Sequence, residues 1–112
     1  MRNSIQSTIV FALLVSFSMF ANVYSQTIPR VKGSPPYDKV RATLLKYGWV
    51  AVKQTEECGV SCTYFRKRGW VETQQCADMG AVAPCIFIFK NTSGKLLEVM
   101  TIGEDPTFSE FR

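Results

Sequence analysis

The sequence predicts a small α+β domain in which one main helix packs on a mainly antiparallel sheet of three or four strands, stapled by disulfides. Three observations lead to this prediction: an apolar stripe of helical spacing that ends at a glycine, two apolar runs around a polar turn, and four cysteines. We expect the domain to occupy residues 37–103, between an extended lead-in at 26–36 and an irregular tail at 104–112.

The main helix is expected to begin near Tyr37 and to end before Gly48. Its apolar side chains recur at i, i+3, i+7 and i+10, the spacing of one helix face, at Tyr37, Val40, Leu44 and Tyr47. Ser34 is the expected N-cap, followed by two prolines in the permissive first turn. Gly48 then follows as a left-handed stop.

Shorter elements are expected after this helix. Residues 49–52 are rich in β-forming residues and predict a strand. Residues 56–61 are expected to form a loop, 63–66 a short strand and 70–79 a short helix.

A β-hairpin is predicted for the last third of the chain. The run 85–89 is apolar at every position, which is typical of a strand covered on both faces. Residues 91–94 are the expected turn, and 96–102 the returning strand. Alternation in the returning strand places one set of side chains on a single face: Leu97, Val99 and Thr101.

Residues 1–25 have the pattern of a secretory signal peptide. Arg2 supplies the positive start, 9–20 the apolar stretch, and 23–25 a cleavage site with small or modest residues. A retained anchor is less favoured, because serines interrupt an apolar run already shorter than the roughly 18–20 residues that span a bilayer. Cleavage would leave 87 of the 112 residues, one domain with no integral membrane span.

Export would place the cysteines in the periplasm or outside the cell, where disulfides are the default. The short, turn-prone chain within each pair favours Cys58–Cys62 and Cys76–Cys85. On a loop-closure model these bonds contribute about 2 and about 2.5–3 kcal/mol. The crossed pairings stay open, because they would constrain the unfolded chain slightly more. A domain this small hides only about 60–65 % of its unfolded surface, so it needs such constraint.

No cofactor and no metal site are expected. The spacing C-x3-C, x13, C-x8-C is too loose for a zinc knuckle, and C-x3-C differs from the C-x-x-C of thioredoxin-like redox sites. The chain has no histidine, the usual base of a hydrolytic triad, and no serine in a recognisable nucleophile turn. Glu72 is interpreted as a helix-surface neighbour of Cys76. We therefore expect no catalytic residues and no enzyme activity.

Charge narrows the class of partner. Without Arg2 the formal net charge falls from +4 to +3, which is too mild for nucleic-acid binding. The one concentrated basic patch lies among aromatic residues, and the candidate binding residues are Tyr64, Arg66, Lys67, Arg68 and Trp70. The alternative interpretation of this patch is a solvated loop between two elements.

A partial resemblance covers residues 28–52. The segment Ile28-Pro29-Arg30-Val31-Lys32-Gly33, with Val40, Leu44 and Gly48 after it, resembles the first half of a PASTA module. That resemblance implies a small module of cell-wall or penicillin-binding proteins that contacts peptidoglycan or a partner domain. The four cysteines depart from the PASTA pattern.

A broader resemblance spans most of the chain after residue 35. The residues that carry it are Pro36-Tyr37-Asp38, Gly48-Trp49, Trp70-x-Glu72-x3-Cys76, Cys85-x-Phe87-x-Phe89 and Thr101-Ile102-Gly103-Glu104. They look like those of a group of small exported proteins of Gram-negative bacteria. The resemblance implies an α+β fold and a Cys76–Cys85 bridge, and it carries over no activity and no functional residues.

These observations favour an exported binding module without catalysis, acting through a protein of the cell envelope. An inhibitor or immunity protein is one concrete form, in which the segment 56–68 would plug the cleft of a partner. The alternatives are a module that binds peptidoglycan or an anionic surface, and a structural subunit of an envelope assembly.

Overall fold

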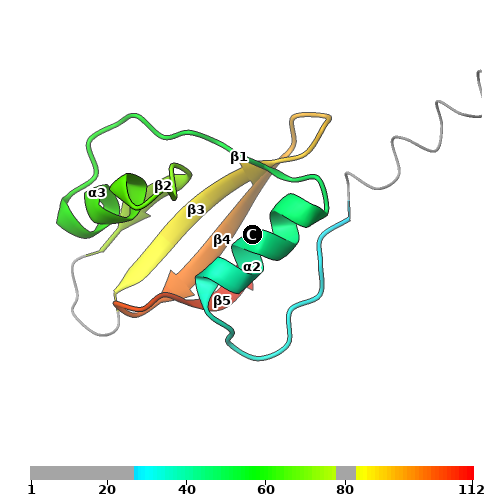
Figure 1. Cartoon of the computed structure of the whole chain (residues 1–112), viewed down its shortest axis with the longest axis horizontal. Coiled ribbons are helices and arrows are strands. Elements are labelled where there is room, and N and C mark those ends of the chain that lie inside the picture. The colour runs from blue at the N-terminus through cyan, green and yellow to red at the C-terminus, as the bar shows by residue number, and fades with distance from the viewer. Residues whose placement is uncertain (1–26, 78–82) are drawn as a thin grey trace, which may run out of the picture.

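The computed structural model describes residues 27–77 and 83–112, and it confirms the α+β class. The predicted signal segment 1–25 lies outside the described residues. Within the described residues, two helices and five strands follow one another (Figure 1): α2 (Tyr37–Lys46), β1 (Val50–Ala51), α3 (Val60–Lys67), β2 (Thr73–Cys76), β3 (Pro84–Lys90), β4 (Leu96–Ile102) and β5 (Thr107–Phe111).

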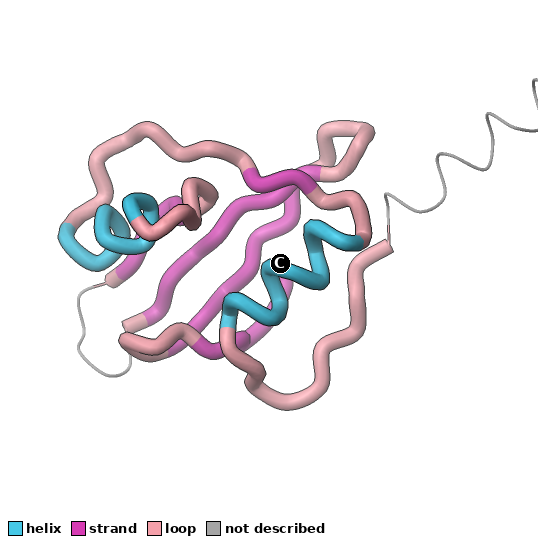
Figure 2. Tube along the Cα trace, in the orientation of Figure 1, coloured by secondary structure: helices cyan, strands magenta, loops and turns pink. Residues whose placement is uncertain are grey.

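The strands form one antiparallel sheet in the order β1-β3-β4-β5, and β2 pairs with β3 as well. β4 occupies one edge of β3 along its whole length, so β1 and β2 share the other edge. β1 pairs with the Lys90 end of β3, and β2 with the Cys85 end. Both helices lie on the same face of this sheet (Figures 1 and 2).

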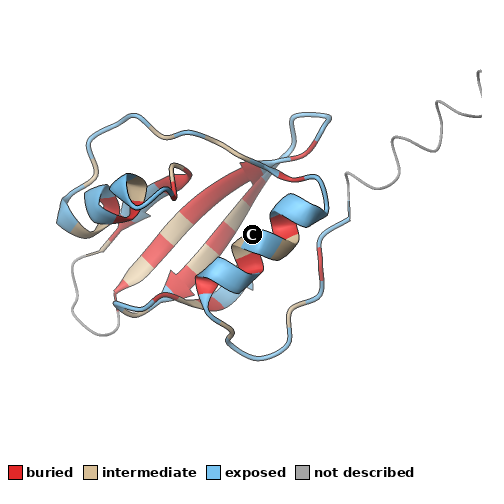
Figure 3. Cartoon of the chain, in the orientation of Figure 1, coloured by how far each residue is buried: buried red, intermediate tan, exposed pale blue. Residues whose placement is uncertain are grey.

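The predicted hairpin is confirmed. β3 and β4 pair so that Phe87 lies opposite Val99 and Phe89 opposite Leu97. All four side chains are buried and point toward the helices, whereas Leu96 and Ile102 on the alternate positions of β4 are exposed. The burial pattern shows this as red bands on the sheet beneath the helices (Figure 3).

Aromatic rings hold the helices on the sheet. Tyr37 of α2 stacks on Phe87 of β3, with ring centroids 3.7 Å apart, and meets the edge of Trp70 at 4.8 Å. Phe65 of α3 approaches Trp70 at 5.3 Å and Phe87 at 6.3 Å. One continuous core therefore joins both helices to β3.

Both helices end in the same glycine–tryptophan turn. At the end of α2, Gly48 has φ of 92° and the Trp49 N–H donates to the Leu44 carbonyl at 3.0 Å. At the end of α3, a glycine with φ of 115° lets the Trp70 N–H donate to the Phe65 carbonyl, also at 3.0 Å. This is the Schellman arrangement, which confirms the predicted stop at Gly48 and places a buried tryptophan just after each helix.

The segment between the predicted helix and the hairpin differs from expectation. Residues 63–66, predicted as a strand, lie inside α3, and part of the expected loop 56–61 is its first turn. Residues 70–79, predicted as a helix, contain β2 instead. The reason is tertiary: β2 satisfies its backbone by pairing with β3, and Cys76 is bonded to Cys85 across that pairing.

The structure also differs from the sequence prediction at the two ends of the domain. Pro36, not Ser34, is the N-cap of α2, and no side chain caps this helix. The tail 104–112, predicted to be irregular, contains the edge strand β5, which pairs with β4. Its Phe108 is buried, and the Phe108 N–H donates to the Pro35 carbonyl of the lead-in at 2.8 Å. Lead-in and tail thus hold each other in place.

Candidate functional site

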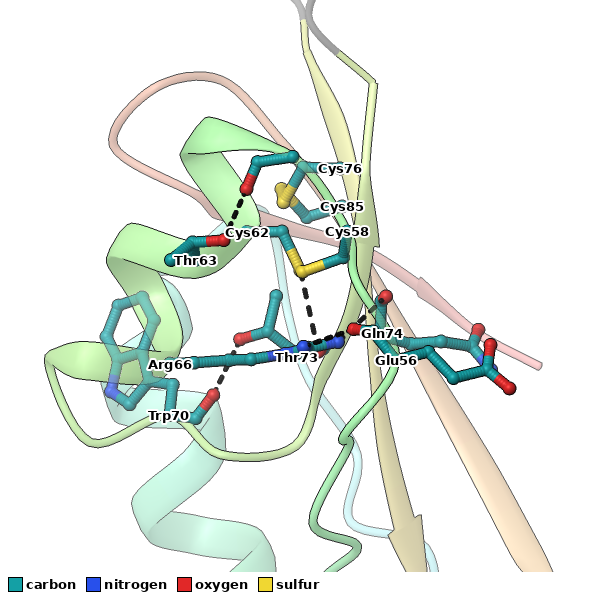
Figure 4. The surroundings of a disulfide bond; sticks show 11 residues. Glu56, Cys58, Cys62, Thr63, Arg66, Trp70, Thr73, Gln74, Cys76 and Cys85 are labelled. Atoms are coloured by element: carbon teal, nitrogen blue, oxygen red, sulfur yellow. Dashed lines mark hydrogen bonds between the residues drawn. A yellow bond between two sulfur atoms is a disulfide. The ribbon is translucent and has the colours of Figure 1, made fainter.

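The two disulfides are the ones favoured by the sequence, Cys58–Cys62 and Cys76–Cys85. The first joins the loop before α3 to the first turn of that helix, and the second joins directly opposite residues of β2 and β3 (Figure 4). The first therefore fixes the preceding loop to α3, and the second fixes β2 to β3. Two disulfides indicate an oxidising environment.

Arg66 has a structural role and is not a free cation. Its Nε donates to the Thr73 carbonyl at 2.9 Å, Nη1 to the Glu56 carbonyl at 2.5 Å and Nη2 to the Gln74 carbonyl at 3.4 Å (Figure 4). Two of these acceptors belong to β2, so the guanidinium covers carbonyls on that strand. It joins α3, the loop before it and β2 at one point.

The other members of the predicted basic and aromatic patch are separated. Trp70 is buried in the core and is not available as a stacking surface. The Arg68 guanidinium lies over the Trp70 ring, 4.2 Å from its centroid, in a cation–π contact. Of the predicted binding residues, Tyr64 and Lys67 are exposed on α3, and Arg68 is exposed at its C-cap.

The outward side of α3 carries a stripe of exposed residues at i, i+3, i+4 and i+7, which we call the α3 face: Val60, Thr63, Tyr64 and Lys67. Val60 is 81 % exposed and Tyr64 is 61 % exposed, more than any other large hydrophobic residue in the described ranges. The opposite side of the helix is buried through Cys62 and Phe65. The helix therefore packs its inner side into the core and exposes two large hydrophobic side chains, Val60 and Tyr64, on its outer side.

A hollow lies on each side of the Val60–Tyr64 ridge. The sheet-side hollow, of about 510 Å³, lies between α3 and the sheet, and its lining includes Val60, Tyr64, Phe65, Ala83, Cys85 and Glu104. The loop-side hollow, of about 480 Å³, is lined by Val60, Tyr64, Glu57, Gly59, Thr63 and Lys67. Since the same two side chains line both, the α3 face and its hollows form one continuous surface.

Glu72 is the ionisable residue whose place the sequence interpretation got wrong. It is fully buried, not a helix-surface neighbour of Cys76, and it accepts hydrogen bonds from the Tyr37 hydroxyl at 2.6 Å and from Arg41 Nε at 2.7 Å and Nη2 at 3.2 Å. Burial, with the neighbouring Glu72 carboxylate, raises the pKa of Tyr37. The hydrogen bond to Glu72 raises the pKa of Arg41. This triad ties α2 to the turn before β2.

The α3 face and its hollows present apolar side chains, the Lys67 ammonium and the carboxylates of Glu57 and Glu104. No group of three or more histidine, cysteine, aspartate or glutamate side chains that could hold a metal is found in 27–77 and 83–112. Among the same residues, none of the helices is long and apolar enough to cross a bilayer. Comparison with protein-family models, with curated proteins and with solved structures found no match.

Two of the residues at the site were missed by the sequence interpretation. Val60 lies in what was expected to be a loop, and Glu104 in what was expected to be an irregular tail. The Lys67-Arg68-Gly69-Trp70 segment held a usable signal, because it repeats the Lys46-Tyr47-Gly48-Trp49 pattern that ends α2. Extending a helix back from Gly69 would have placed Val60 and Tyr64 one turn apart on the same face.

Proposed function

We propose that this protein is an exported binding domain without catalytic activity and that it recognises a protein partner through the α3 face. The observation that carries the proposal is the exposure of Val60 and Tyr64 on adjacent turns, with a hollow on either side. Aromatic side chains beside pockets are frequent anchors of protein interfaces, because they bury a large area with few rotatable bonds.

The anchoring of α3 supports this proposal. The helix is held at its start by Cys58–Cys62, near its end by Arg66, and along its inner side by Phe65 in the core. A surface that is already ordered loses little conformational entropy when a partner binds. The α3 face is suited to binding because little of the helix has to be ordered on contact.

The proposal of export has two supports. The pattern of residues 1–25 is that of a signal peptide, and the two disulfides suit an oxidising compartment such as the periplasm or the extracellular space. A protein partner of the cell envelope follows from that location. An inhibitor or immunity protein is one form of this function, with α3 in place of the loop that the sequence suggested as the plug.

A protein partner is favoured over peptidoglycan or another anionic surface by the placement of charge. Arg66 donates to three carbonyls, and the exposed Arg68 lies over the Trp70 ring beyond the end of α3, so Lys67 is the cation on the α3 face. Glu57 and Glu104 line the two hollows beside it. A mixed surface of this kind gives little attraction to a polymer of one charge.

Site-specific photo-cross-linking in intact cells tests the proposal. A photoreactive phenylalanine analogue at position 60 is expected to yield discrete adducts with a protein, and Tyr64→Asp in the same chain is expected to abolish them. The same analogue at Leu96, which is 58 % exposed on the other face of the sheet, is the matched control and is expected to yield none.

Two outcomes would reject the proposed function. The first is labelling from position 96 with none from position 60, and the second is labelling from position 60 that persists unchanged with Tyr64→Asp. Salt-sensitive sedimentation with isolated peptidoglycan, lost with Lys67→Ala, would instead support the anionic-surface alternative.

A further inference from the structure

We propose that the sheet-side hollow accepts an apolar side chain from an extended segment of the partner, and that a lysine or arginine next to that side chain pairs with Glu104. This inference rests on the proposed function and adds to it the chemistry of the partner. Its basis is the combination of an apolar floor, one acidic side chain on the wall, and continuity with the exposed ridge of α3.

The floor of the hollow is apolar and ordered. Phe65 of α3, Cys85 of β3 and Ala83 just before β3 are all buried and all line it. Cys85 is bonded to Cys76, so its sulfur is not available for thiol chemistry. The volume of about 510 Å³ is within the range of roughly 300–1,000 Å³ that is usual for ligand pockets. Such a floor favours an aliphatic or aromatic side chain.

Glu104 gives the hollow its charge. It stands in the turn between β4 and β5, and among the described residues that line the hollow it is the one that is charged. The ion pairs found among the described residues are Arg41–Glu72 and Arg112–Glu110, so Glu104 has no cation partner among them. Asp105 follows it, and Glu57 lies across the Val60 ridge. This end of the α3 face is therefore acidic on a protein whose net charge is +4.

The polarity of the surface sets a direction for the occupant. Lys67 lies two helical turns from Val60, and it lines the loop-side hollow together with Glu57. A bound segment that places its cation at Glu104 and crosses the Val60–Tyr64 ridge enters the loop-side hollow, which Lys67 lines. Electrostatic complementarity of this kind contributes to specificity more than to affinity.

Continuity with the ridge favours a chain segment as the occupant. Val60 and Tyr64 line both hollows, so a molecule seated in one hollow meets the ridge and can continue into the other. An extended peptide reaches across such a ridge with successive side chains, while its main chain stays in solvent.

Selection from a random peptide library displayed on phage tests the inference. The bait is the full chain, produced through an exporting host so that both disulfides form, and the control bait carries Tyr64→Asp. Peptides enriched only on the unmodified protein are expected to carry an apolar residue next to lysine or arginine.

The affinities of synthetic copies of the enriched peptides for variants of the protein then measure the contribution of Glu104. Glu104→Lys is expected to weaken binding at least tenfold, and Glu110→Lys, on the exposed end of β5, is expected to change it less than twofold. Far-ultraviolet circular dichroism and a mass measurement of the intact disulfides confirm that each variant is folded.

The outcomes distinguish failure of the inference from failure of the proposed function. Enriched peptides that require Tyr64 but bind Glu104→Lys as tightly as the unmodified protein overturn the inference and leave the proposed function standing. Enrichment that is the same on the Tyr64→Asp bait, or no enrichment at all, overturns both. Enriched peptides with an acidic residue in place of the basic one also overturn the inference.

Discussion

Removing Arg41 should destabilise the protein more than neutralising Glu72, although the two side chains form a single ion pair. The Glu72 side chain is fully buried, whereas that of Arg41 is 24 % exposed. Arg41→Met leaves a buried carboxylate with the Tyr37 hydroxyl as its remaining partner, a loss of about 3–5 kcal/mol. Glu72→Gln keeps that hydroxyl bond and leaves a guanidinium that can turn to water, so about 1–3 kcal/mol is expected.

Urea unfolding followed by tryptophan fluorescence, with both disulfides intact, measures these differences. Arg112→Met is the matched control, because the Arg112–Glu110 pair has a similar distance of 3.0 Å but is exposed, and its removal is expected to change stability by about 0–1 kcal/mol. The loss of stability with Arg41→Lys should lie between those of Arg41→Met and the control, because lysine keeps the positive charge but cannot donate from two nitrogens to the carboxylate. A larger loss for Glu72→Gln than for Arg41→Met, or losses equal to the control, would refute this reasoning.

Three further predictions concern stability. Because burial and Glu72 raise the pKa of Tyr37, the folded protein keeps the hydroxyl proton at a pH where the unfolded chain loses it. The free energy of unfolding is therefore expected to be unaffected below about pH 10 and to fall by about 1 kcal/mol from pH 10 to 11. Urea titrations at each pH should show that Tyr37→Phe removes this fall and that Tyr47→Phe retains it. Replacing Cys76 and Cys85 together by alanine should cost about 2.5–3 kcal/mol in the same assay, and an unchanged midpoint would contradict the loop-closure argument. Gly69→Ala should cost about 1–2 kcal/mol, because φ at Gly69 is +115° while nothing crowds the added carbon, and a smaller cost would show that the backbone adjusts freely.

The elements that could be predicted from the sequence are those with a long periodic signal. The stripe from Tyr37 to Leu44 has helical spacing and a glycine stop, and the hairpin has two apolar runs around a polar turn. Both signals are local, so they can be recognised without knowledge of the rest of the fold. The pairing of the cysteines was likewise favoured by short loops.

The elements that were missed depend on contacts between distant parts of the chain. β2 exists because it pairs with β3, and its segment is short and polar, with Gln74 and Gln75 exposed. β5 exists because β4 and the lead-in hold it on either side, as the bond from the Phe108 N–H shows. Local propensity carries no information about such partners.

The residues of the candidate site likewise fall into those that a local sequence pattern indicated and those that depend on contacts between distant parts of the chain. Tyr64 and Lys67 were predicted as binding residues from the run of basic residues among aromatic ones, and they are exposed on the α3 face. Arg66 and Trp70 were assigned to the same patch, but each is used inside the protein, for a network of carbonyls and for the core. Glu104 could not be joined to α3 from the sequence, because the turn that carries it reaches the helix only through the sheet.

The central claim is that a protein partner binds through the α3 face, and an affinity comparison with the cross-linked partner tests it most directly. With both proteins purified and the disulfides intact, Tyr64→Ala is predicted to weaken binding at least tenfold, which corresponds to about 1.4 kcal/mol. Leu96→Ala, a change at a similarly exposed residue on the other face of the sheet, is predicted to weaken it less than twofold. Equal effects of the two substitutions, or a larger effect of Leu96→Ala, would contradict the claim.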